Sequence, residues 1–165
     1  MAEAKLAEKP VAAAGAEVLT VKDLQAWYGE SHILHGVNFN VKAGEVVTLL
    51  GRNGAGKTTT LKSVMGIIGK RTGSIRFDNV DITRASSDKI ARMGVAFCPE
   101  ERGIFASLDV RENLLLPPIV RAGGLALDQI FDLFQALRER LNSQCPKLPG
   151  VENDMLAISR LRRNG

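Results

Sequence analysis

The sequence predicts an α/β fold with a phosphate-binding loop, and three adjacent stretches support this prediction. The run EVVTLL, residues 45–50, is largely apolar and contains β-branched residues, which is typical of a strand buried on both faces. The glycine-rich stretch GRNGAGKT, residues 51–58, follows it directly. The apolar residues of TTTLKSVMGI and its flank then recur at helical spacing, at Leu61, Val64, Met65 and Ile68. Strand, loop and helix in this order form a βα unit.

Strands are expected on both sides of this unit. Alternation in VLTVKDLQAWY and in GVNFNV predicts two early strands of a sheet with one exposed face, with a turn at Ala43 and Gly44. SIRFDNVDI predicts a further strand and turn. SSDKIARMG predicts a short helix that Ser86 or Ser87 caps and Gly94 ends. VAFC, residues 95–98, predicts a second buried strand.

The chain becomes largely helical after Pro99. Asp109 and Glu112 stand at capping-box spacing, and Pro117 and Pro118 interrupt the helical pattern. One amphipathic stripe follows, which is core or partner surface, at Ile130, Leu133, Phe134, Leu137 and Leu141. The last stretch predicts a helix with Met155, Ile158 and Leu161 on its apolar face. We therefore expect three parts: a disordered low-complexity tail over residues 1–17, an α/β nucleotide-binding core over 18–98, and a helical subdomain over 99–165.

Composition excludes several classes of protein. With 165 residues, 45% of them hydrophobic and 24% charged, the chain is typical of a globular domain with a real core. The net charge is only +4, and Arg160, Arg162 and Arg163 form the one basic cluster, so we expect no nucleic-acid partner. Cys98 and Cys145 lie far apart and indicate neither a zinc site nor a disulfide framework. No apolar run is long enough to cross a membrane, and no signal peptide is apparent.

The loop GRNGAGKT has the spacing G-x-x-x-x-G-K-[ST] of a nucleotide-phosphate site. Its glycines let backbone N–H groups turn toward phosphate oxygens, Lys57 reaches the β and γ phosphates, and the Thr58 hydroxyl binds Mg²⁺. The alternative is a glycine turn that merely connects two elements. Tyr28, some two dozen residues earlier, either stacks on a purine base or packs at a strand end.

Read together, three segments resemble the nucleotide-binding subunit of ABC transporters. They are YGESHILHGVNFNVKAGEVVTLLGRNGAGKTTTLKSVMGI, TGSIRFDNVDIT and GVAFCPEERGIFASLDVRENL. The stretch PEERGIFASLDVRENLLL is similar to the subunits of importers for branched-chain amino acids, or for urea and amides. This resemblance implies an ABC-type P-loop NTPase domain, here incomplete, with a sheet core and a helical subdomain but without the Walker B half.

The resemblance also implies roles for individual residues. Tyr28 matches the aromatic residue that stacks on adenine, and Glu100 matches the Q-loop glutamine. Glu100 either coordinates the metal or is a plain surface carboxylate. The implied ligands are ATP and Mg²⁺, with Thr58 and Glu100 at the metal. The residues that match the family's nucleotide-binding loop are Asn53, Gly54, Ala55, Gly56, Lys57, Thr58 and Thr59.

The end of the sequence departs from the family pattern. The signature LSGGE or LSGGQ corresponds here to LPGVE, so Pro149 and Val151 are expected to remove the clamp on a nucleotide bound by the opposite subunit. The Walker B aspartate, the catalytic glutamate and the switch histidine have no counterpart in residues 1–165. We therefore expect no catalytic residue, no ATP hydrolysis by this chain alone, and a truncated or damaged gene product.

The implied function is that of an ATPase subunit that energises the import of branched-chain amino acids. Its implied partners are ABC permease subunits and a second, identical or different, ATPase subunit. Through the permease it would lie peripherally on the cytoplasmic face of the inner membrane. One alternative is a non-catalytic nucleotide-binding or regulatory partner of a permease or an intact ATPase subunit. An unrelated P-loop kinase would need a different continuation after the loop.

Overall fold

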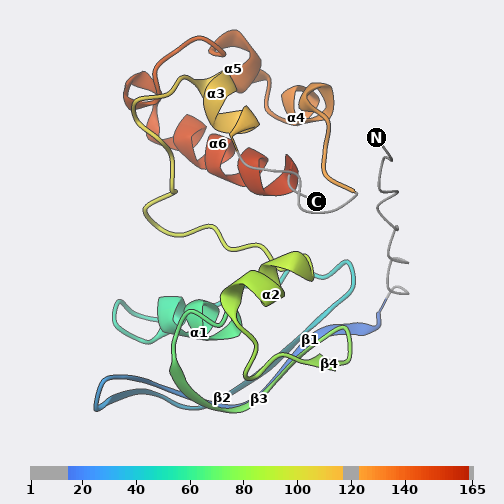
Figure 1. Cartoon of the computed structure of the whole chain (residues 1–165), viewed down its shortest axis with the longest axis vertical. Coiled ribbons are helices and arrows are strands. Elements are labelled where there is room, and N and C mark those ends of the chain that lie inside the picture. Colours follow the sequence, from blue (N-terminus) through green and yellow to red (C-terminus); the bar gives the residue numbers. More distant parts are fainter. Residues whose placement is uncertain (1–14, 117–122, 164–165) are drawn as a thin grey trace, which may run out of the picture. The chain divides into compact units, whose positions relative to one another are not determined.

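The computed structural model describes residues 15–116 and 123–163. The chain divides after Val95, and the described residues on either side of this point form two compact units, each treated by itself below (Figure 1). The first unit contains the sheet and the glycine-rich loop. Most of the tail expected over residues 1–17 lies outside the described residues, as do Pro117 and Pro118. The predicted domain limits stay predictions.

Four antiparallel strands form the sheet of the first unit, in the order β2-β1-β3-β4. They are β1 (Glu17–Tyr28), β2 (Ser31–Lys42), β3 (Lys70–Phe77) and β4 (Val80–Asp81). The strands predicted from alternation are thus confirmed, and so is the turn at Ala43 and Gly44. Asp78 and Asn79, which join β3 to β4, have φ of 48° and 63°. Positive φ at both central residues is what a tight hairpin turn of type I′ requires.

A bulge in β1 is enclosed by glycines of both neighbouring strands. The register shifts near Asp23, whose φ is 47°, and its N–H donates to Asn38 Oδ1 at 2.9 Å. A Cβ at Gly36 would lie 2.8 Å from Asp23 Oδ1, and a Cβ at Gly73 only 2.3 Å from the carbonyl oxygen of Asp23. At Gly73 the close atom belongs to the backbone, so the bulge needs glycine there, whereas at Gly36 the close atom is a side-chain oxygen that can move.

Two helices of the first unit, α1 (Lys57–Val64) and α2 (Ser87–Arg92), lie on the same side of the sheet (Figure 1). Ser86 is the N-cap of α2, as expected, although its side chain makes no capping bond, and Gly94 follows the helix with φ of 98°. Leu61 does not join the predicted apolar face, because 47% of its surface is exposed. The core of this unit is made of Val21, Leu24, Ala26, Leu34, Val64, Met65, Ile68, Ile75, Ile82 and Ile90.

The two buried strands predicted at residues 45–50 and 95–98 are absent, which corrects that prediction. Both segments are irregular, and Val46 and Leu50 are 94% and 84% exposed. A strand buried on both faces requires hydrogen-bonded neighbours and apolar cover on each side. Among the described residues, no strand pairs with either segment. The composition of residues 45–50 therefore suits burial, but the segment is not buried in this chain.

Four helices make up the second unit, and α6 contacts the other three. They are α3 (Val110–Leu115), α4 (Leu127–Leu133), α5 (Gln135–Glu139) and α6 (Gly150–Arg163), with a 3-10 turn at Cys145–Lys147. Their core is one cluster of buried side chains: Val110, Leu114, Ile130, Phe131, Leu137, Cys145, Leu148 and Leu156. In the described parts of the chain, no helix is long and apolar enough to cross a membrane.

Two apolar faces predicted in this unit need correction. The stripe of residues 130–141 is not continuous, because the backbone turns at Phe134, with φ −133° and ψ 71°, and leaves Leu133 exposed. On α6 the buried side chains are Leu156, Ala157 and Ser159. Of the predicted face, Met155 packs against the core, whereas Ile158 is exposed. Leu156 occupies the shared core, and its position sets which face of α6 is covered.

The buried amide of Asn113 fixes the loop that leads into α3. Its Oδ1 accepts the N–H of Phe105 at 3.0 Å, and its Nδ2 donates to the carbonyls of Phe105 and Asp109, both at 3.0 Å. Nδ2 also lies 3.1 Å from the sulfur of Cys145. Because Asn113 is fully buried, these contacts satisfy polar groups that water cannot reach.

The predicted capping box of α3 is confirmed. Asp109 Oδ1 accepts the Glu112 N–H at 2.7 Å, and Glu112 Oε2 accepts the Asp109 N–H at 2.9 Å. We expect Asp109→Ala to lower the free energy of unfolding by about 1 kcal/mol, because one helix N–H loses its acceptor. Urea denaturation checks this value. Asp132→Ala, at an exposed position of α4, is the control, and an equal loss in both variants would contradict the role of the cap.

Candidate nucleotide-binding site

The glycine-rich loop, residues 51–56, leads directly into α1. Gly56 is the N-cap of α1, with φ 87° and ψ 7°, and its carbonyl accepts both the N–H and the hydroxyl of Thr60, at 2.8 and 3.0 Å. Within the loop, the Ala55 N–H donates to the Arg52 carbonyl at 3.1 Å. Asn53, Gly54 and Ala55 are exposed. The loop thus closes on itself and presents its tip to solvent.

Contact with β2 and a left-handed backbone both disfavour a side chain on the last glycine of the loop. Gly56 is buried, and a Cβ there would lie 2.7 Å from Leu34 Cδ2. Its positive φ also disfavours any other residue. The loop therefore rests on Leu34, a residue that the sequence analysis did not single out. Its position in a strand, apolar and 22 residues before Gly56, carries no signal for this contact.

The start of α1 offers hydrogen-bond donors to an anion. In the described part of the chain, the N–H groups of Lys57, Thr58 and Thr59 have no hydrogen-bond partner, and no side chain caps the helix. The first turn contains no acidic residue. Unpaired N–H groups and the positive end of the helix dipole together favour an anion. The residues present therefore fit the phosphates of a nucleotide.

The Lys57 ammonium lies at the start of the same loop. Its Nζ donates to the carbonyls of Gly51 and Arg52, at 2.8 and 2.9 Å. These two acceptors are neutral, so they hold the ammonium at the start of the loop without neutralising its charge. An ammonium has three donors, so it can bind phosphate oxygens from this position.

The three threonines after Lys57 differ in exposure. Thr58 is exposed, so its hydroxyl is accessible to a hydrated metal ion, whereas Thr59 and Thr60 are buried. Thr59 can therefore offer its backbone N–H rather than its side chain. Among the described residues, no cluster of three or more His, Cys, Asp or Glu side chains is arranged to hold a metal. Within the first unit, a Mg²⁺ ion here would depend on Thr58, water and the nucleotide itself.

Tyr28 lies at the end of the strand pair that supports the loop. Ala26 pairs with Leu34, and alternation along β1 places the Tyr28 ring on the same face as Leu24 and Ala26. The Tyr28 side chain is half exposed, so its ring has a free surface. Glu100 is exposed and belongs to the other unit, so its shared metal site with Thr58 stays a prediction.

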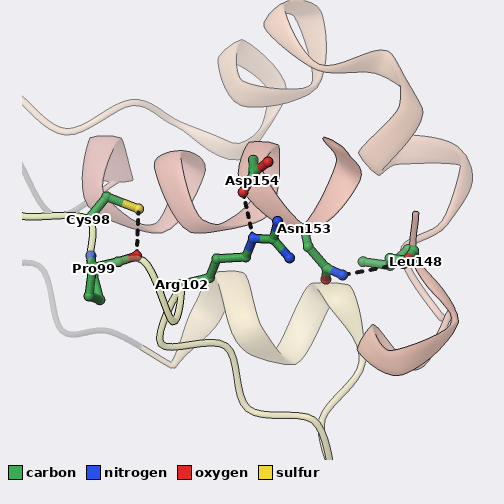
Figure 2. A network of polar contacts seen from close by, with 6 residues as sticks. All are labelled: Cys98, Pro99, Arg102, Leu148, Asn153 and Asp154. Atoms are coloured by element: carbon green, nitrogen blue, oxygen red, sulfur yellow. Dashed lines mark hydrogen bonds and ion pairs between the residues drawn. The ribbon is translucent and has the colours of Figure 1, made fainter. Parts of the chain in front are cut away.

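The segment LPGVE, residues 148–152, leads into α6 and includes its first residues, from Gly150 on. Leu148 is buried, its carbonyl accepts the Asn153 side chain at 3.3 Å, and Val151 is 65% exposed (Figure 2). The Glu152 carboxylate pairs with Arg140 at 2.9 Å. Pro149 has no N–H to donate, and the exposed Val151 side chain would meet any ligand that approached this helix start.

Comparisons with known proteins assign the chain to a family. A family model described as ABC transporter matches residues 34–162. The high-affinity branched-chain amino acid transport ATP-binding protein BraG of Pseudomonas aeruginosa is 36% identical over 146 residues, which cover 87% of this chain and 63% of BraG. The lipopolysaccharide export system ATP-binding protein LptB of Escherichia coli is 35% identical over 148 residues, 86% of this chain and 61% of LptB. The chain thus spans about three fifths of the length of these relatives.

Solved structures agree with this assignment. The structure of an ATP-binding subunit of an ABC transporter superposes with a TM-score of 0.71 at 28% identity, over 88% of this chain and 62% of that one. A nucleotide-free ATP-binding cassette from an ABC transporter gives a TM-score of 0.74 at 24% identity, over 90% of this chain and 65% of that one. At this lower identity the likeness concerns the fold alone.

Proposed function

The chain belongs to the ABC transporter family and has the α/β P-loop fold of its nucleotide-binding cassettes, and from this premise we propose that it binds ATP with Mg²⁺ as part of a transporter's ATP-binding subunit. The observation that carries the proposal is the set of unpaired N–H groups at the start of α1, beside the Lys57 ammonium. These groups match the negative charge and the acceptor oxygens of a polyphosphate.

Each residue of the proposed site has a distinct role. The unpaired N–H groups of residues 57–59 bind phosphate oxygens, the Lys57 ammonium binds the β and γ phosphates, and Thr58 binds Mg²⁺. When bound, Mg²⁺ supplies charge neutralisation between the β and γ phosphates. Tyr28 stacks on the adenine ring. Glu100, in the other unit, is the proposed second protein ligand of the metal.

Branched-chain amino acids are the solutes that we propose for the transporter. Support comes from the resemblance of residues 99–116 to such importers and from the transport function named for BraG. The competing assignment is lipopolysaccharide export, to which the name of LptB refers. The proposed partners are permease subunits and a second ATPase subunit, at the cytoplasmic face of the inner membrane. Affinity purification of the tagged chain from its own cells, with mass spectrometry, tests the proposed solute and the proposed partners. Recovery of an amino-acid permease supports the proposal, and recovery of lipopolysaccharide-export components contradicts it.

A non-catalytic partner is the second candidate, and the start of α6 favours it. Pro149 and the exposed Val151 leave this segment poorly suited to bind a nucleotide held by another subunit. Such a chain would bind ATP at its own loop without hydrolysing it. Phosphate release measured with the chain alone and with its co-purified subunits separates the two candidates, since a catalytic subunit must raise the rate.

A nucleotide series tests the proposed site most directly. We expect the purified full chain to bind ATP and ADP at least tenfold more tightly than adenosine, because the loop's donors contact only the phosphates. Isothermal titration with Mg²⁺, and again with EDTA, measures the affinities. Equal affinities for ATP and adenosine would contradict a phosphate site.

The adenine contact gives a separate prediction. Tyr28→Ala should weaken ATP binding by about two- to tenfold, since aromatic stacking contributes about 0.5–1.5 kcal/mol. Tyr28→Phe keeps the ring and should bind ATP as the natural chain does. If Tyr28→Phe lost as much affinity as Tyr28→Ala, the hydroxyl rather than the ring would carry the contact, and the stacking role would be wrong.

A further inference from the structure

A cavity of about 200 Å³ lies in the second unit, between residues 97–103 and α6. Apolar side chains line much of it, among them Phe97, Pro99 and Leu161. Two guanidinium groups, those of Arg102 and Arg160, line it as well, together with the Cys98 thiol. None of the described residues that line it is acidic. The cavity therefore combines apolar walls with two guanidinium groups, of which that of Arg102 is paired with Asp154.

Arg160 is held in place by contacts that leave most of its donors available. Its guanidinium donates to the Gly103 carbonyl and lies over the Phe105 ring, with Cζ 5.3 Å from the ring centroid. Nε of Arg160 is buried and has no hydrogen-bond partner among the described residues. A buried N–H without an acceptor costs free energy.

Arg102 is oriented from the opposite wall. Its Nε donates to Asp154 Oδ1 on α6 at 2.6 Å, and Figure 2 shows the guanidinium reaching across from the loop to that helix. This ion pair uses one of the five guanidinium donors, so both terminal nitrogens stay available. The Cys98 thiol in the same view is directed toward the Pro99 carbonyl, 3.9 Å away.

We propose that this cavity binds a small organic anion, a carboxylate on a short apolar chain. The carboxylate accepts hydrogen bonds from Arg102 and Arg160, and the chain covers Phe97, Pro99 and Leu161. The cavity is open to solvent, so its volume of about 200 Å³ limits only the part of the ligand that it encloses; a cavity of about 150 Å³ holds a benzene molecule. A ligand of about five carbons fits. This site is separate from the glycine-rich loop and does not depend on nucleotide binding.

Cys98 reports occupancy of the cavity. It is the exposed thiol of the pair, while Cys145 is buried. Burial, and after it the nearby Asp154, hold the pKa of the Cys98 thiol above its ordinary value, although Arg102 opposes this. A ligand beside it should block alkylation. We therefore expect pentanoate to slow the modification of Cys98 by iodoacetamide at least fivefold in the purified full chain. The protection should saturate as the pentanoate concentration rises, and mass spectrometry of the intact protein follows the modification.

Two further probes distinguish the contribution of the ligand's carboxylate from that of its apolar chain. Pentan-1-ol has the same chain without the carboxylate, and inorganic phosphate is an anion without the chain. Each should protect Cys98 at least tenfold less effectively than pentanoate. Equal protection by pentan-1-ol would overturn the role of the arginines, and equal protection by phosphate would overturn the ligand class. No protection by pentanoate would overturn the site.

Variants of the arginines supply the last test. Arg160→Gln and Arg102→Gln should each raise the half-protecting concentration of pentanoate at least tenfold. Arg162→Gln, exposed on the same helix and outside the cavity, should not change it. Circular dichroism shows whether each variant is folded. If a variant does not fold, the comparison of pentanoate, pentan-1-ol and phosphate on the natural chain still tests the proposal. Unchanged protection in both cavity variants would overturn the proposal.

Discussion

Lys57→Ala should weaken ATP binding at least 100-fold. Within the first turn of α1, all of which the structure describes, the ammonium is the one side-chain cation, and its contacts with phosphate oxygens would be charge-assisted hydrogen bonds of about 1.5–3 kcal/mol each. In the structure Nζ donates to the carbonyls of Gly51 and Arg52, both in an exposed loop, so the fold does not depend on it. Isothermal titration measures the affinity, and urea denaturation should show a change in stability of less than about 0.5 kcal/mol.

Lys62→Ala is the matched control for this experiment. Lys62 lies in the last turn of the same helix, so its replacement removes the same charge at the other end of α1. ATP affinity should change by less than threefold. If both variants lost ATP affinity equally, the loss would come from the lower net charge and not from a contact of Lys57 with the phosphates. If Lys57→Ala bound ATP as before, the site assigned to the loop would be wrong.

Gly73→Ala should destabilise the first unit strongly, with a loss of more than about 3 kcal/mol in the free energy of unfolding. The new Cβ would lie 2.3 Å from the Asp23 carbonyl oxygen and 2.7 Å from that of Lys22. Both contacts are to backbone atoms of the paired strand, so no side-chain movement relieves them. The φ of +101° adds about 1–2 kcal/mol of strain for any residue with a Cβ.

Two other glycines separate these contributions. Gly29 has a φ of +57° with no atom within 4 Å of an added Cβ, so Gly29→Ala should cost only the strain, about 1 kcal/mol. Gly69 has neither a positive φ nor a close neighbour, and Gly69→Ala should be neutral or slightly stabilising. Urea unfolding of the three variants tests this order. A loss in Gly73→Ala no greater than in Gly29→Ala would contradict the bulge geometry.

The sequence predicted correctly those elements that depend on interactions between residues close in sequence. The alternation of β1, the turn at Ala43 and Gly44, and the capping box of Asp109 and Glu112 all depend on residues close in sequence. The loop at residues 51–58 was likewise recognisable from spacing, and its geometry fits an anion. The roles of its residues, and those of Tyr28 and Glu100, stay predictions.

Long-range packing accounts for what the sequence did not predict. Residues 45–50 have the composition of a buried strand, but their state depends on neighbours that the described chain does not supply. On α6 the periodicity allowed more than one apolar face, and the contact of Leu156 with the helical core selects one. The support of Gly56 by Leu34 joins residues far apart in sequence, so no local pattern reveals it.

The open state of residues 45–50 has a practical consequence for anyone handling the protein. Their backbone is not part of a sheet, and large side chains such as Val46 and Leu50 are accessible. Proteases that cut beside aliphatic residues act first where the chain is unpaired. A cut here would break the backbone between the β1–β2 hairpin and the phosphate loop. The contact between Leu34 and Gly56 would still hold the two pieces together. A nicked preparation could therefore run intact on a sizing column, and only a denaturing gel would reveal the break.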